Sequence, residues 1–198
     1  MSTPDPLSKL AEKLRADETV ISAHVVDPLA EPIFGPLAAL GPRAEAERQA
    51  YALVVESIRE GYELHYGTPR ILSGQDEDLA LLAGDYLYAL GLERLAGLDD
   101  DEAVAELSDL ISLCATCHTE GITQIVPALW LASAVAVGCG GGTEHEESKR
   151  ALRAGSPGAA EALLRSARAT AAASGLRDAL DHAAESIDFA LPGPADSG

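Results

Sequence analysis

Apolar side chains recur at helical spacing in residues 81–96, LLAGDYLYALGLERLA, more clearly than elsewhere in the chain. The positions that follow this spacing are Leu81, Leu82, Tyr86, Tyr88, Ala89, Leu92 and Leu95. The pattern predicts a helix over residues 79–98 with a broad buried face. Because an interior glycine costs about 1 kcal/mol relative to alanine, Gly84 indicates that a neighbouring backbone approaches closely. Asp85 follows it, and a carboxylate on an apolar helix needs donors or a partner charge.

The same spacing predicts helices along most of the remaining chain. They cover residues 7–16, 44–66, 103–119, 128–137, 144–155, 159–174 and 176–191. Four prolines lie within residues 20–42, and they limit that segment to helical fragments at 23–29 and 36–40. We therefore predict an all-α protein, in which the short helix 7–16 packs only weakly on the rest.

The helix pattern also indicates how the chain is organised. Residues 1–43 are expected to form an N-terminal helix and a proline-rich irregular segment, residues 44–191 the helical core, and residues 192–198 a disordered tail. A chain of 198 residues is the size of one domain. We therefore expect these three parts to belong to a single domain.

The charge of the chain excludes some partners. It contains 14 Lys and Arg against 32 Asp and Glu, which gives a formal net charge of −18. Nucleic acids and anionic membrane surfaces would be repelled by such a protein. Both a high-salt habitat and GC-rich coding bias would produce this acidic composition. No nucleic-acid partner is predicted.

The chain also lacks the apolar segments that direct proteins to membranes. Residues 1–18 have no apolar core of the signal-peptide kind. The most apolar run, residues 125–138, is shorter than the roughly 20 residues that span a bilayer. These features predict a cytoplasmic protein without a membrane span, whose three cysteines are free thiols.

Ala83 to Leu87, AGDYL, resembles the AGD-aromatic-Leu helix of the trans-prenyltransferases, the all-helical polyprenyl diphosphate synthases. Gly67-Thr68-Pro69 stands where that family has an RRGxPT turn, and Glu56 to Glu60 (ESIRE) fills the place of its Asp-rich DDxxD motif without a gap. The resemblance extends over residues 44–131. It implies a helical bundle of the isoprenoid-synthase type, with orthogonal and antiparallel helices. Because the chain is shorter than a complete synthase, we expect a truncated form of that bundle.

The residues that carry the family's chemistry are replaced in this chain. In that family the DDxxD carboxylates hold Mg²⁺ ions that grip an allylic diphosphate. Glu56 and Glu60 keep the one-turn spacing, but Ser57 replaces the middle acid. We expect these two glutamates to be solvated charges on an exposed helix face. His65 and Tyr66 stand in place of an Arg-Arg pair that contacts diphosphate, and no second DDxxD is present. The sequence therefore predicts neither catalytic residues nor a magnesium cofactor, although the resemblance would imply one.

Three functional hypotheses follow. The first is a catalytically silent accessory subunit, similar to the small subunits of heterodimeric polyprenyl diphosphate synthases, that pairs with itself or with a full-length synthase. The second is a stand-alone helical protein that binds an isoprenoid or another apolar ligand. The third is an enzyme of altered chemistry that uses Glu56, Glu60, His65 and Asp85.

Helix 79–98 is the predicted dimer element, because the synthases it resembles pair through this helix and its neighbour. Its apolar residues also extend round more of the helix than one core contact requires. The predicted interface residues are Gly84, Asp85, Tyr86, Tyr88 and Leu92. The alternative is a central helix buried on all sides within one chain.

Cys114, Cys117 and His118 form the C-x-x-C-H pattern that attaches c-type haem. Such a site would make the chain a haem or redox protein, and Cys139 could join the pair in a zinc or redox site. On the predicted helix 103–119, however, the two cysteines are three residues apart. In that position they can serve as small core residues.

Overall fold

The fold is described from a computed structural model, which covers residues 5–191 of the chain. These residues form a single all-α domain with nine α-helices. The helices are α1 (Pro6–Ala16), α2 (Phe34–Ala39), α3 (Arg48–Tyr66), α4 (Glu77–Ala96), α5 (Asp101–Glu120), α6 (Val126–Cys139), α7 (Gly142–Arg153), α8 (Ala159–Ala173) and α9 (Arg177–Ser186). Three 3₁₀ turns lie between them, at Ser22–His24, Pro42–Ala44 and Thr123–Ile125. The all-α prediction is confirmed, since the described residues contain no strand beyond an isolated bridge between Val25 and Leu72.

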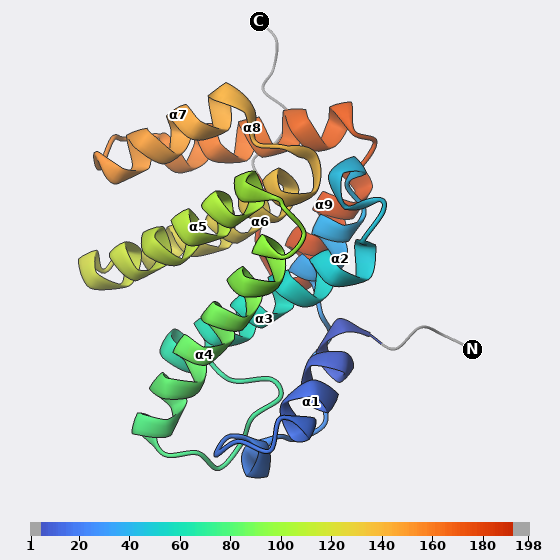
Figure 1. Ribbon diagram of the computed structural model, residues 1–198. Helices are drawn as coiled ribbons and strands as arrows, with labels where there is room; N and C mark the ends of the chain where they lie inside the picture. Colours follow the sequence, from blue (N-terminus) through green and yellow to red (C-terminus); the bar gives the residue numbers. More distant parts are fainter. Residues whose placement is uncertain (1–4, 192–198) are drawn as a thin grey trace, which may run out of the picture.

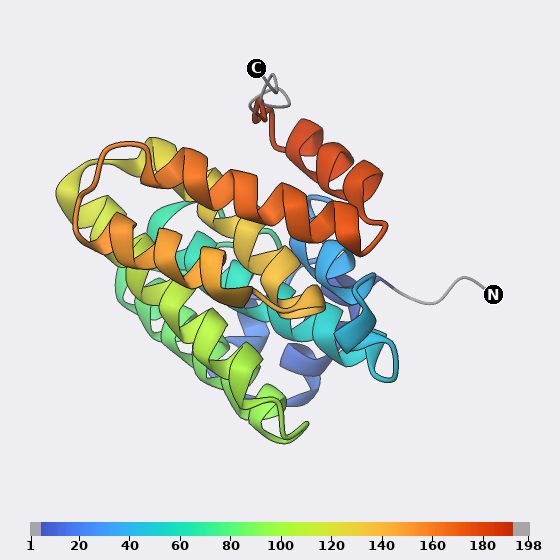
Figure 2. The same cartoon turned by 90° about the horizontal axis from the view of Figure 1, so that it is seen from above.

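The helices are arranged around the apolar helix α6, of which nearly every residue is buried. α3 and α4 lie side by side, and α5 passes from the end of α4 across α6 (Figure 1). α7 and α8 cover α5 and α6 on the opposite side from α4, as the view from above makes clear (Figure 2). None of the helices among residues 5–191 combines the length and the apolar character needed to cross a bilayer.

Glycines let α3 and α4 approach each other closely. A Cβ atom at Gly84 would lie 2.6 Å from His65 Nε2, and one at Gly61 would lie 2.8 Å from the ring of Tyr88. The close approach predicted at Gly84 is confirmed, and the neighbouring backbone is that of α3. Since α3 fills the space beside it, Gly84 is buried. Its backbone is used within the chain, and its place in an interface with a second chain stays a prediction.

The N-terminal helix packs more tightly than its sequence suggested. The four apolar residues on its inner face, Leu7, Leu10, Ala11 and Leu14, are fully buried. They contact a separate core cluster that also contains Leu53 of α3, Leu87 of α4, and Leu72 in the connection between those helices. The expectation of weak packing is wrong, because residues distant in sequence supply the partner surface.

The proline-rich segment behaves only partly as predicted. The helical fragment expected at residues 23–29 is absent, and a 3₁₀ turn at Ser22–His24 leads instead into extended backbone at Val25. There Val26 donates a backbone hydrogen bond to Ile71, which holds the segment against the α3–α4 connection. The fragment expected at 36–40 is present as α2.

The last helix is shorter than predicted. α9 ends at Ser186, and Asp188 follows with a left-handed φ of 53°. That backbone conformation cannot continue a right-handed helix. The predicted tail, residues 192–198, lies outside the described residues.

Candidate functional site

The two glutamates at the position of the Asp-rich motif are buried and bind an arginine. Glu56 and Glu60 are 0% exposed. Arg70 donates to Glu56 Oε2 through Nη1 at 2.7 Å and to Glu60 Oε2 through Nε at 3.0 Å. The expectation that these glutamates lie on an exposed helix face is wrong, because the segment after α3 folds back and covers them.

The remaining carboxylate oxygens accept backbone hydrogen bonds. Glu56 Oε1 accepts from the N–H groups of Ile33 at 3.1 Å and Gly35 at 2.8 Å, which are at the start of α2. Glu60 Oε1 accepts from the N–H groups of Arg70 at 2.7 Å and of the following residue at 3.0 Å. The pair therefore joins α2, α3 and the α3–α4 connection.

This arrangement does not fit a magnesium cluster. Mg²⁺ is held by carboxylate oxygens together with water and phosphate, whereas all four oxygens of Glu56 and Glu60 already accept from protein donors. Ser57, the second residue of the motif position, donates to the carbonyl of Leu87 at 3.0 Å and so ties α3 to α4. All three residues serve the packing of α3.

The residues at the predicted diphosphate position belong to a stack of aromatic rings. The His65 ring stacks on Tyr88 at 5.3 Å, and its Nε2 lies 3.2 Å from Asp85 Oδ1. The Tyr66 ring stacks on His118 at 4.0 Å. The structure thus brings His65 and Tyr66 together with residues predicted for two other roles, namely an interface on α4 and a haem site on α5.

Arg59 adds a cation to this aromatic cluster, and sequence reasoning missed it. Its guanidinium lies about 5 Å from three ring centroids, at 5.0 Å from Phe34 and 4.8 Å each from Tyr62 and Trp130. Glu63, one turn further along α3, pairs with it at 2.5 Å. The Arg59–Glu63 spacing was visible in the sequence. Phe34 and Trp130 come from α2 and α6, and no local pattern links them to α3.

The C-x-x-C-H residues do not fit a covalent haem site. The side chains of Cys114 and Cys117 are 1% and 2% exposed within α5. His118 Nε2 lies 3.0 Å from the Tyr62 hydroxyl. Burial raises the pKa of Cys114 to about 12, so the thiolate form is disfavoured. Attachment of a porphyrin would require both thiols to leave the core, which they fill as small apolar side chains do.

The predicted interface residues of α4 are exposed to solvent to different degrees. The side chain of Asp85 is 76% exposed. Tyr86 is half-buried and donates its hydroxyl to Asp17 beyond α1 at 3.0 Å. Tyr88 and Leu92 are half-buried where α4 meets the main core. Part of the predicted surface is therefore used within the chain, and the outward side towards α5 remains open.

The outer face of α5 is free of charge over four turns. The residues of this face, called the α5 face below, are Val104, Ala105, Ser108, Ile111, Ser112, Ala115 and Thr119, all exposed or half-buried. The half-buried Asp109 lies beside this face towards α7, where it pairs with Lys149 and Arg153. Val104 and Ile111 pack on the same core as Tyr88 and Leu92 of α4. These two residues join the α5 face to the main core, and α5 is in contact with α4.

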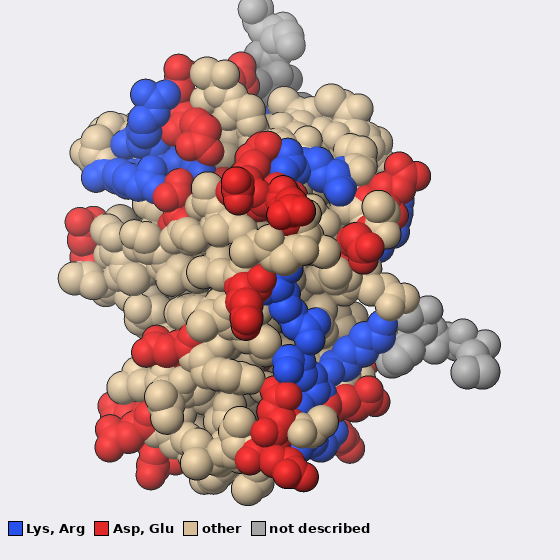
Figure 3. All heavy atoms as spheres, in the orientation of Figure 1, with Lys and Arg blue, Asp and Glu red and all other residues tan. Residues whose placement is uncertain are grey.

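The charge distribution makes the α5 face unusual for this protein. The chain has a formal net charge of −18, yet a broad uncharged band covers α5 (Figure 3). Charged side chains gather over α7 above this band and over the lower helices. Two strongly acidic proteins repel each other least where the surfaces that meet carry no charge.

A second buried polar cluster lies between α5, α6 and α7, and no local sequence pattern indicated it. Glu106 of α5 accepts from Ser133 Oγ at 2.6 Å and from Lys149 Nζ at 2.6 Å. Burial opposes the charged carboxylate, but the hydrogen bonds and charges of His145 and Lys149 prevail and hold the pKa of Glu106 below its usual value. The pKa of Lys149 is raised, because its carboxylate partners outweigh its burial. The cluster therefore stays ionised at neutral pH.

No protein family, curated protein or solved structure matches this chain.

Proposed function

We propose that the protein is a non-catalytic helical subunit of the polyprenyl-synthase type, which associates with a second copy of itself through the α5 face. The proposal combines the sequence resemblance over residues 44–131 with the chemistry of α3 and the charge of α5. The observation that carries it is the uncharged α5 face on a chain of net charge −18.

The state of the α3 carboxylates supports a non-catalytic role. Catalysis by that family depends on carboxylates that are free to hold Mg²⁺ against a departing diphosphate. In this chain Glu56 and Glu60 are not free, because both form ion pairs with Arg70. Arg59 places its charge among the aromatic rings at the centre of the bundle.

The dimensions of the α5 face support self-association. With a rise of about 1.5 Å per residue, the stretch from Val104 to Thr119 is roughly 24 Å long. Together with the adjacent edge of α4, it could bury on the order of 1,000 Å² over two chains, which is the lower range for a specific interface. A two-fold arrangement would place α5 against α5, and the small residues Ala105, Ser108 and Ser112 would allow the two helices to approach closely.

Sedimentation velocity of the purified chain tests the association. We expect the mass of two chains at micromolar concentration. A monomer under these conditions would contradict self-association. If the same monomer bound a complete polyprenyl diphosphate synthase, the α5 face would serve a heterodimer instead.

The purified chain is expected to show no prenyl transfer with Mg²⁺ and short allylic diphosphates, because the carboxylates that would bind the metal already accept from Arg70 and from backbone N–H groups. Product formation measured with radiolabelled isopentenyl diphosphate checks this, with a complete synthase as the positive control. Turnover that is lost in Glu56→Gln or Glu60→Gln, in variants that remain folded, would overturn the non-catalytic role.

A further inference from the structure

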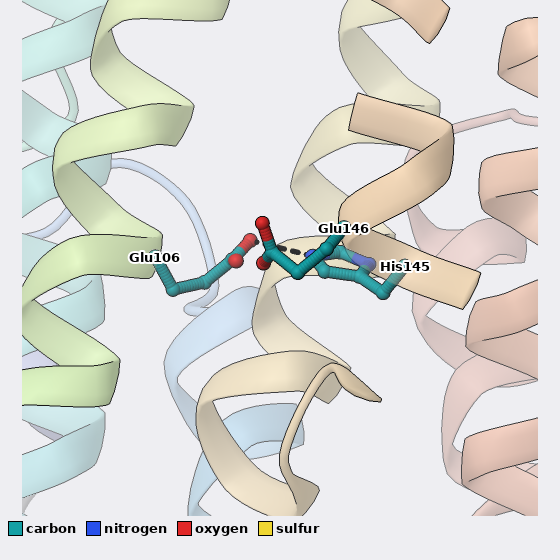
Figure 4. Close-up of side chains that lie close together, drawn as sticks. All are labelled: Glu106, His145 and Glu146. Carbon is teal, nitrogen blue, oxygen red and sulfur yellow. Dashed lines mark hydrogen bonds and ion pairs between the residues drawn. The ribbon is translucent and has the colours of Figure 1, made fainter. Parts of the chain in front are cut away.

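The buried cluster between α5 and α7 contains a set of metal-ligating side chains outside the α5 face. Glu106 comes from α5, and His145 and Glu146 come from the first turns of α7. One ligand atom from each lies within 4.8 Å of the other two. Figure 4 shows the two carboxylates and the imidazole pointing towards one another from the two helices.

Two of the three ligand atoms are hydrogen-bonded to each other, and a metal ion would replace the proton between them. Glu106 Oε1 and His145 Nε2 are 3.0 Å apart. Zinc holds nitrogen and oxygen ligands at about 2.0–2.2 Å, so neighbouring ligands of a tetrahedral ion lie roughly 3.3–3.5 Å apart. A shift of a few tenths of an ångström would therefore bring these two atoms to the required separation.

The cluster combines fixed ligands with a mobile one. Glu106 and His145 are 6% and 2% exposed, and Ser133 Oγ holds the Glu106 carboxylate in place at 2.6 Å. Glu146 is 51% exposed, so its side chain can swing towards them. A surface pocket of about 530 Å³, lined by Glu106 and Glu146 among others, leads from solvent to this point. The pocket would admit the ion and leave coordination positions for water.

Lys149 already supplies a positive charge to the cluster, so a metal ion must displace it from Glu106 and Glu146. The exposure of Glu146 permits this, whereas Glu56 and Glu60 are fully buried around Arg70. Its ammonium lies among three carboxylates, at 2.6 Å from Glu106, 2.9 Å from Asp109 and 2.7 Å from Glu146. A metal ion would coordinate Glu146 and one carboxylate oxygen of Glu106, while Lys149 would remain paired with Asp109. The lysine is therefore a competitor of the metal within the chain, and its removal should tighten metal binding.

We propose that Glu106, His145 and Glu146 form a binding site for a divalent transition-metal ion of the zinc class, which bridges α5 and α7. Imidazole together with carboxylates suits zinc and its neighbours, whereas magnesium and calcium prefer sites made of oxygen ligands alone. The three ligands lie outside the α5 face, and Ala105 of that face lines the pocket beside them.

Calorimetric titration of the chain without a histidine tag tests the site. Zn²⁺ is added in the presence of excess Mg²⁺, which occupies the acidic surface. We expect one zinc ion per chain. In Glu146→Gln the affinity should fall at least about tenfold, since a ligand is removed. The matched control is Glu147→Gln, because Glu147 is the next residue of α7 and is 63% exposed. Equal zinc affinity in the two variants, or no stoichiometric binding to the wild type, would overturn the proposal.

Two further measurements identify the ligands. Co²⁺ bound by nitrogen and oxygen should give visible d–d bands, whereas an intense near-ultraviolet thiolate-to-cobalt band would assign the ion to the cysteines and overturn the proposal. Lys149→Gln should bind zinc more tightly than the wild type. Because Lys149 is buried, this variant is first checked for native circular dichroism, and Glu146→Gln remains decisive if it does not fold.

Discussion

Ser112→Glu is expected to convert the dimer into a folded monomer. Ser112 lies on the α5 face and is exposed. In a two-fold interface each chain would bring a new carboxylate towards that of its partner, and like charges placed together at an interface cost several kcal/mol. We expect the dimer dissociation constant to rise by at least about a hundredfold, corresponding to 2.7 kcal/mol or more. Sedimentation velocity over a range of protein concentrations measures this change.

The matched control for Ser112→Glu is Ala169→Glu. Ala169 is exposed on α8, a helix that packs on α6 and α7, and its replacement adds the same charge. This variant should remain dimeric. Circular dichroism and thermal unfolding should show both variants folded. A dimer that persists in Ser112→Glu would place the interface elsewhere, and dissociation of both variants would attribute the effect to net charge.

Arg70→Met is expected to destabilise the fold by about 3–5 kcal/mol, which is the usual cost of leaving a buried charge without its partner. The substitution leaves the carboxylates of Glu56 and Glu60 fully buried, with only backbone donors. Since a domain is typically stable by about 5–15 kcal/mol, much of the margin would be lost. The free energy of unfolding in urea measures the effect.

Two variants separate the buried pair from a general effect of losing an arginine. Arg150→Met removes a side chain that is 67% exposed and lies 3.9 Å from its acidic neighbour, so it should change stability by no more than about 0.5 kcal/mol. Combining Arg70→Met with Glu56→Gln and Glu60→Gln removes the unpaired charges and should restore much of the stability. Equal losses in Arg70→Met and Arg150→Met would show that the buried pairing contributes little.

Local spacing was sufficient to predict the helices. Residues 81–96 lie in α4 as predicted, and the glycine within them indicated the close contact that Gly84 makes with α3. The buried face predicted for this helix is wrong, because Leu81, Leu82 and Ala89 are exposed, whereas Ala83, Leu87 and Leu90 are buried between α4 and its neighbours. Helical spacing determines which side of a segment is apolar, and this information lies within a few turns of the chain. The all-α class follows from the same pattern repeated along the sequence.

Pairings between distant segments could not be predicted in this way. Glu56 and Glu60 looked like solvated charges because nothing in α3 shows that Arg70 folds back over them. Glu106 and Lys149 are 43 residues apart, and they meet only because α7 lies over α5. The sequence alone determined the helices and the acidic character of the chain. The tertiary structure decided which charges are buried, which metal ligands converge and which helix face stays open, because these depend on contacts between helices and not on the pattern within any one of them.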